Sequence, residues 1–115
     1  MTNLYPFNDQ IMNAQSVDET VSGVKNCIGF PYLGAYVVGN GTTSSGVITF
    51  EEAPSEDFAG AWSSIATMDA SDVTGGITKA QAFTVRAYAY VRARISTAIG
   101  GGGTVTVYLT GAPGA

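Results

Sequence analysis

The sequence contains no histidine and a single cysteine, Cys27. Without an imidazole, nucleophilic sites that pair serine or cysteine with histidine are excluded, and so are zinc sites built on histidine ligands. One cysteine cannot form a disulfide within the chain, and its apolar surroundings, "VKNCIGF", predict a small buried side chain. We therefore expect no catalytic residues, no bound metal and no cofactor.

Charge is also scarce. Charged residues make up 12% of the 115 residues, about half the usual share of a soluble domain. A surface with so little charge predicts that a partner, or further copies of the chain, cover part of it. Nine acidic residues against five basic ones give a net charge of −4, which argues against nucleic acid as a partner.

Long hydrophobic runs are missing as well, so no segment is predicted to span a membrane. The first residues, "MTNLYPFNDQ", have neither a basic start nor an apolar core, which argues against a signal peptide. We expect the chain to be made and folded in a cytoplasm. Its length predicts one domain.

The clearest pattern present is alternation of apolar and polar residues. It runs through residues 83–96, "FTVRAYAYVRARIS", and again through residues 104–110, "TVTVYLT". The first run is longer than most strands, so we expect a bend or bulge near Ala87–Ala89. Further runs end at Val38 and begin at Val47, with turn signals between them. In the run that begins there, Ile48 and Phe50 are predicted to share one face.

This spacing of strands and turns predicts an all-β fold, an antiparallel, jelly-roll-like β-sandwich of seven or eight strands. We assign residues 14–115 to the sandwich. Residues 1–13 are polar and irregular and are expected to form an extended N-terminal arm.

Gly100–Gly103 is a run of four glycines between two predicted strands. A phosphate-binding loop would need a helix N-terminus or a P-loop lysine after it, and the sequence provides neither. The run is therefore interpreted as the loop of a hairpin, where glycine tolerates positive φ.

Basic and aromatic residues share one face of the run 83–96. This face is expected either to bind a partner or to be an ordinary solvated surface with cation–π contacts inside the chain. Single-stranded nucleic acid on this face is disfavoured by the acidic chain. The residues of the face are Arg86, Tyr88, Tyr90, Arg92 and Arg94.

An acidic cluster is predicted in a loop, "EEAPSEDFAG", which contains Glu51, Glu52, Glu56 and Asp57. The preferred interpretation is a solvated loop. Pairing with the arginines of a neighbouring molecule and calcium binding remain alternatives, although no EF-hand spacing is present. A glycosidase pair would need one of these acids in an apolar cleft. Trp62 could stack on a sugar, but a lone tryptophan at the start of a strand is more often part of the core.

Two stretches carry a resemblance to a known family. "SSGVITFEEAPSEDFAGAWSSIATMDAS" followed by "AYAYVRARISTAIGGGGTVTVYLTG" resembles small virion proteins of tailed bacteriophages, over about residues 44–111. The shared pattern is a strand such as "GVITFE", an acidic loop, a Trp-led strand such as "AWSSI", and a closing pair of strands. Where the family often has "EGSxDG" after the first strand, this chain has "EEAPSED".

The resemblance implies a non-enzymatic capsid decoration (cement) protein on the virion surface. Its partners would be the major capsid protein and copies of itself, expected as a homo-trimer. The arginine–tyrosine face and the acidic loop would then be docking surfaces, and the arm would add Leu4, Tyr5 and Phe7. Similar strand patterns occur in carbohydrate-binding sandwiches. A glycan- or receptor-binding module of a phage tail or fibre, using Trp62, is therefore the alternative.

Overall fold

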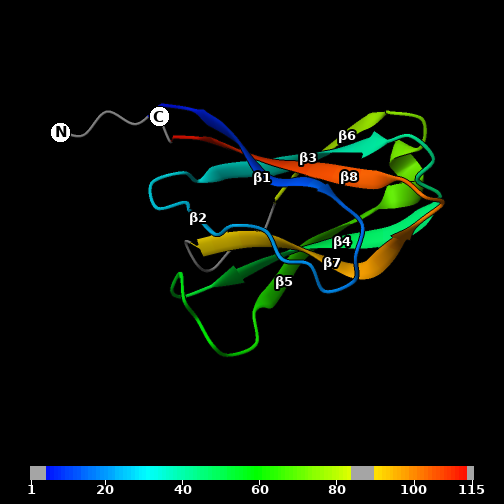
Figure 1. Ribbon diagram of the computed structural model, residues 1–115. Coiled ribbons are helices and arrows are strands. Elements are labelled where there is room, and N and C mark those ends of the chain that lie inside the picture. The colour runs from blue at the N-terminus through cyan, green and yellow to red at the C-terminus, as the bar shows by residue number, and fades with distance from the viewer. Residues whose placement is uncertain (1–4, 84–89, 114–115) are drawn as a thin grey trace.

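Two antiparallel sheets of four strands each form the protein in a computed structural model that describes residues 5–83 and 90–113 (Figure 1). Their orders are β1-β8-β3-β6 and β2-β7-β4-β5. Consecutive strands change sheet except β4 and β5, which is the strand order of a jelly roll. The predicted fold is confirmed. The elements are β1 (Phe7–Gln15), β2 (Lys25–Asn26), β3 (Tyr32–Asn40), β4 (Ser45–Ala53), β5 (Ser63–Asp69), the 3-10 helix η1 (Ala70–Val73), β6 (Thr78–Ala82), β7 (Tyr90–Gly100) and β8 (Thr104–Ala112).

The core lies between the two sheets and follows the predicted alternation. Ile48 and Phe50 of β4 have no exposed surface. The same holds for Val91, Ala93 and Ile95 of β7. Burying each of the larger side chains stabilises the fold by about 1.5–3 kcal/mol. Cys27 is also fully buried, as predicted from its apolar surroundings. No described helix is long and apolar enough to cross a membrane.

The predicted N-terminal arm needs correction. β1 begins at Phe7, pairs with β8 and buries Met12 in the core, so residues 7–13 belong to the sandwich. The segment looks irregular in sequence because β1 is an edge strand whose register against β8 shifts twice, which interrupts the alternation.

The run 83–96 is not one strand. The backbone N–H of Phe83 donates to the carbonyl of Leu33 in β3 (2.8 Å), which continues the pairing of β6. Tyr90 instead pairs with Ala53 of β4, in the opposite sheet. Phe83 and Tyr90 therefore belong to different sheets. Residues 84–89, with the bend expected near Ala87–Ala89, lie outside the described part of the chain.

The glycine run is not a hairpin loop either. β7 and β8 belong to different sheets, so Gly100–Gly103 carries the chain across the sandwich. Gly101 and Gly102 do adopt positive φ, +86° and +82°, as predicted. The β3–β4 connection crosses beside it, and the Ser44 N–H donates to the Gly100 carbonyl (3.0 Å). Alternation along a strand shows which side chains face the core. It does not show to which sheet the next strand in the sequence belongs.

Candidate functional site

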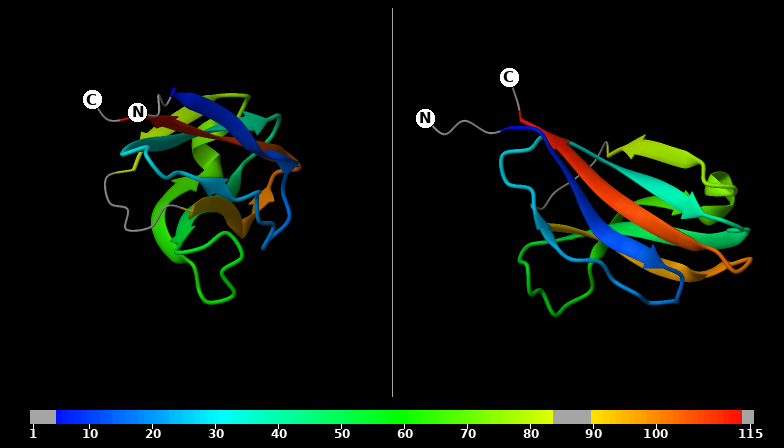
Figure 2. Two further views of the ribbon diagram at one scale, coloured as in Figure 1. Left: turned by 90° about the vertical axis from the view of Figure 1, so that its left-hand side faces the viewer. Right: turned by 45° about the horizontal axis from the view of Figure 1, so that its top comes forward.

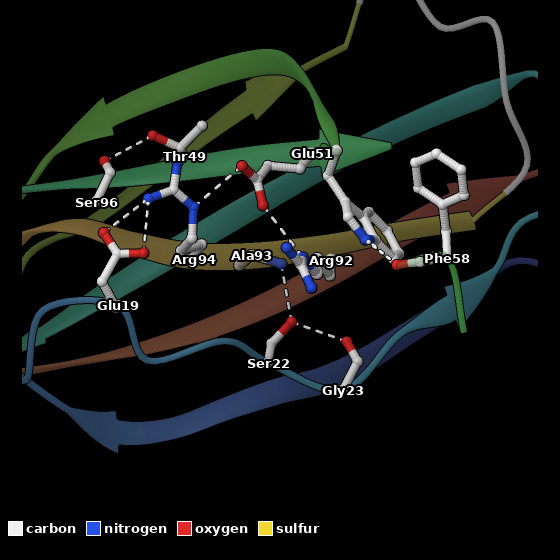
Figure 3. A network of polar contacts seen from close by, with 11 residues as sticks. Glu19, Ser22, Gly23, Thr49, Glu51, Phe58, Arg92, Ala93, Arg94 and Ser96 are labelled. Atoms are coloured by element: carbon white, nitrogen blue, oxygen red, sulfur yellow. Dashed lines mark hydrogen bonds and ion pairs between the residues drawn. The ribbon is translucent and has the colours of Figure 1, made fainter. Parts of the chain in front are cut away.

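The first candidate surface is the outer face of the β2-β7-β4-β5 sheet, which carries two of the predicted arginines. Glu51 of β4 lies between them (Figure 3). Its carboxylate accepts from Nε of Arg92 (3.1 Å) and from Nε of Arg94 (3.0 Å). The Glu51 side chain is only 6% exposed, so one nearly buried carboxylate binds both guanidinium groups.

Arg94 is held from a second side. Its Nη1 donates to both carboxylate oxygens of Glu19, at 3.1 and 3.2 Å. Glu19 belongs to a segment that runs along β7, where its backbone N–H donates to the carbonyl of Ile95 (2.8 Å). The hydrogen bond to Glu51 raises the pKa of Arg94 above the ordinary arginine value, against the opposing effect of burial.

Arg92 also contacts an aromatic ring. Its guanidinium lies 4.1 Å from the centre of the Trp62 ring, in a cation–π contact. The indole Nε1–H of Trp62 donates to the backbone carbonyl of Phe58 (3.1 Å), which closes the β4–β5 loop on itself. Trp62 is therefore partly buried on the outer side of the sheet and is not part of the core. It packs over the arginine and fixes the loop.

The four acidic residues predicted in one loop lie in two different elements of the structure. Glu51 and Glu52 belong to β4, are 4% and 5% exposed, and point to opposite faces of the strand. Glu56 and Asp57 are exposed in the β4–β5 loop, which projects away from the rest of the molecule at the bottom of both views in Figure 2. The prediction of one solvated loop is wrong for the first two residues, because the strand extends through them. Among the described residues no three metal-ligating side chains gather.

The cationic docking surface expected from the sequence is neutralised. Arg92 and Arg94 lie on the predicted face, but both are paired within the chain. The other two described basic residues, Lys25 and Lys79, are also in ion pairs, with aspartates. Tyr90 is half-buried at the start of β7. Arg86 and Tyr88 lie outside the described residues.

The three residues predicted to dock from the arm have different surroundings. Tyr5 is 76% exposed. Phe7 packs edge-to-face on Phe30, with ring centres 4.8 Å apart, and Lys25 lies over its ring at 4.5 Å. Phe7 is thus used inside the molecule, and Leu4 lies outside the described residues.

A second surface, which the sequence did not reveal as one, is the outer face of the β1-β8-β3-β6 sheet. Among the described residues no charged side chain points outward from this sheet, as the strand register and burial show. Tyr36 of β3 and Tyr108 of β8 stack there with ring centres 4.7 Å apart and planes 10° apart. Asn8 of β1 exchanges hydrogen bonds with the Tyr36 hydroxyl (2.9 and 3.1 Å). We call this surface the neutral face.

A groove of about 580 Å³ lies at the end of the neutral face where β1 begins and β8 ends. All its lining residues come from this sheet or from residues next to its strands, so it opens on the outer face and not between the sheets. None of the lining residues is charged. The outward-facing members are Tyr32, Gly34, Tyr36, Ala80, Ala82, Thr110 and Ala112.

Comparisons with known proteins show that this chain is similar in fold to two solved structures. No protein-family model and no curated protein matches the chain. Its structure is similar to that of XepA, an exported protein of phage-like PBSX, with a TM-score of 0.62 at 14% identity. The match covers 95% of this chain and 38% of XepA. A chain from Bacillus endospore appendages, described as disulfide-linked pili, matches with a TM-score of 0.44 at 18% identity, over 99% of this chain and 100% of that one.

Proposed function

We propose that this chain is a non-enzymatic structural protein of a phage or phage-like particle, and within that class a capsid decoration protein. The observation that carries the proposal is the pair of unlike sheet faces. One face has its arginines paired within the chain, and the other exposes stacked tyrosines and uncharged side chains.

The neutral face has the composition expected at the centre of a protein interface. Such centres are depleted in charge and rich in tyrosine, because burying an unpaired charge is costly whereas burying an aromatic ring is favourable. Tyr36 and Tyr108 would therefore be covered without leaving a charge unpaired. Each copy would contribute one modest contact, and the repeated lattice of a capsid would multiply it.

The particle type is supported by two independent resemblances. The strand-and-turn pattern of residues 44–111 resembles phage virion proteins, and the fold resembles that of XepA of PBSX. The partners we propose are the major capsid protein and further copies of this chain, arranged as trimers. The location we propose is the surface of the virion.

Binding to empty, expanded capsids tests the proposal, with an established decoration protein as positive control. Gln10→Lys places a charge beside Tyr108 on the neutral face. Thr67→Lys is the matched control, since it is an exposed edge-strand position on the outer face of the other sheet. We expect Gln10→Lys to weaken capsid binding about tenfold, close to 1.4 kcal/mol, and Thr67→Lys to leave it unchanged.

Two results would contradict the proposal. One is wild-type protein that fails to bind capsids to which the control protein binds. The other is a strict monomer at all concentrations in light scattering, which would remove the proposed trimer. Equal loss in both lysine variants would show that a different surface makes the contact.

A further inference from the structure

We infer that the groove on the neutral face is a binding site for a neutral saccharide. This inference does not rest on the proposed decoration role, although it concerns the same face of the molecule, and it does not use Trp62. It rests on the charge, the size and the aromatic side chains of the groove.

The charge of the groove excludes ionic ligands. Its lining contains no Lys, Arg, Asp or Glu. A phosphate or carboxylate would therefore find no counter-charge, and a cationic amine would find none either. The ligand that suits this lining is uncharged.

The size of the groove suits a small ligand. A volume of about 580 Å³ falls within the range of roughly 300–1,000 Å³ that small-molecule sites occupy. The hollow exists because the outward residues between the two tyrosines of β3 are small: Gly34 on β3 itself, and Ala80 and Ala82 on the neighbouring β6. A Cβ at Gly34 would lie 2.8 Å from the backbone oxygen of Gln81, so this position is restricted to glycine.

The groove presents aromatic rings at both ends. Tyr36 has Tyr108 on one side and Ala80 on the other side in the sheet. Tyr108 stacks on one face of the Tyr36 ring, and the Tyr36 hydroxyl reaches across β8 to Asn8 of β1, so the ring lies over β8 at one end of the groove. Tyr32, 66% exposed, stands four residues away on the same face of β3, roughly 13 Å along the strand. Sugar rings have apolar faces that pack on such aromatic surfaces.

Uncharged hydrogen-bonding groups complete the site. The Thr110 side chain lines the groove and makes no hydrogen bond to another described residue. Residues 77 and 83 direct backbone groups toward β3, so by antiparallel alternation Ala80 and Ala82 direct theirs to the open edge of β6. Hydroxyl and backbone groups beside aromatic rings match the hydroxyls and apolar faces of a sugar better than an all-apolar ligand.

The test is a titration of ¹⁵N-labelled protein with neutral oligosaccharides. The probes are maltotetraose, cellotetraose and the tetramer of N-acetylglucosamine, and a sialylated lactose serves as the charged comparison. We expect one neutral probe to shift amide resonances of the groove, Gly34, Ala82 and Thr110 among them. The charged probe should leave them in place.

Two pairs of variants locate the binding. Ala80→Trp fills the groove from an exposed position of β6, and Thr67→Trp is its control on β5 of the other sheet. Tyr32→Ala removes one ring, and Tyr5→Ala removes a second tyrosine that is highly exposed among the described residues. We expect Ala80→Trp to abolish binding, Tyr32→Ala to weaken it at least about tenfold, and both controls to bind as wild type.

Three outcomes would overturn the inference. The first is that none of the three neutral probes shifts the groove resonances at about 10 mM, roughly ten times a dissociation constant of 1 mM. The second is binding that survives Ala80→Trp in a folded variant. The third is groove resonances that move only with protein concentration, which would assign the groove to a contact between copies of this chain.

Discussion

Replacing Glu51 by glutamine removes the negative charge between Arg92 and Arg94 while keeping the shape of the side chain. A hydrogen bond to a charged partner contributes about 1.5–3 kcal/mol, and breaking a fully buried ion pair costs about 3–5 kcal/mol. Here the carboxylate is buried, but the two arginine side chains are 21% and 25% exposed. Water can therefore compensate part of the loss, and the amide oxygen remains an acceptor for one guanidinium.

We expect Glu51→Gln to lower the free energy of unfolding by about 2 kcal/mol. For a chain of this length that corresponds to a fall in Tm of roughly 8 °C. Glu19→Gln is the matched control, because Glu19 also pairs with Arg94 but is 66% exposed. Exposed pairs contribute little, so this variant should lose at most about 0.5 kcal/mol.

Urea denaturation measures both variants, with far-ultraviolet circular dichroism reporting the sheets and fluorescence reporting Trp62. The midpoint should move while the slope m stays constant, since neither change alters the surface exposed on unfolding. If Glu51→Gln is as stable as Glu19→Gln, the carboxylate is not the centre of the cluster. The assignment of the arginines to an internal role would then fail.

Three further predictions concern other parts of the molecule. Gly101→Ala should be destabilising by more than Gly102→Ala in thermal denaturation. Both have positive φ, which costs about 1–2 kcal/mol, but a Cβ at Gly101 would lie 2.0 Å from a carbonyl oxygen of the neighbouring loop. The raised pKa of Arg94 means that its contribution is fully present below the ordinary arginine value and is lost only as pH rises through the folded value. The stability difference between wild type and Arg94→Gln should therefore stay constant from about pH 7 to 10, measured by urea titration. Cys27 should react with Ellman's reagent only after unfolding, because it has no exposed surface.

The faces of the strands could be predicted from the sequence because they depend on local alternation. Val91, Ala93 and Ile95 point inward as the period of two requires. The partner of each strand depends on contacts far along the chain, which alternation does not encode. That is why the alternation predicts one strand over residues 83–96 and a hairpin at Gly100–Gly103, although Phe83 and Tyr90 belong to different sheets and so do β7 and β8.

β6 shows a second limit of sequence reasoning. Its residues, "TKAQA", have little β propensity, so the sequence does not predict a strand there. They form a strand because β3 offers a free edge with which they pair. The neutral face and its groove depend on this strand, so the groove could not be predicted from the sequence.

The charge cluster was hidden for a related reason. The sequence predicts Glu51 and the two arginines as parts of two separate surfaces, each expected to meet a partner. They are 41 and 43 residues apart, and only the pairing of β4 with β7 brings them together. Residues that appear complementary between molecules can equally be complementary within one molecule, and the register of the sheet decides between the two.

The same register explains why a partner is expected on one sheet and not on the other. The outer face of β2-β7-β4-β5 is partly covered by its own chain, since Trp62 packs over Arg92 and Glu19 reaches Arg94 from the segment beside β7. Figure 2 shows no described segment across the outer face of β1-β8-β3-β6. The aromatic rings of that face remain in water in the isolated chain, so covering them with another surface releases water without burying an unpaired charge. The free energy available for binding therefore lies on the neutral face.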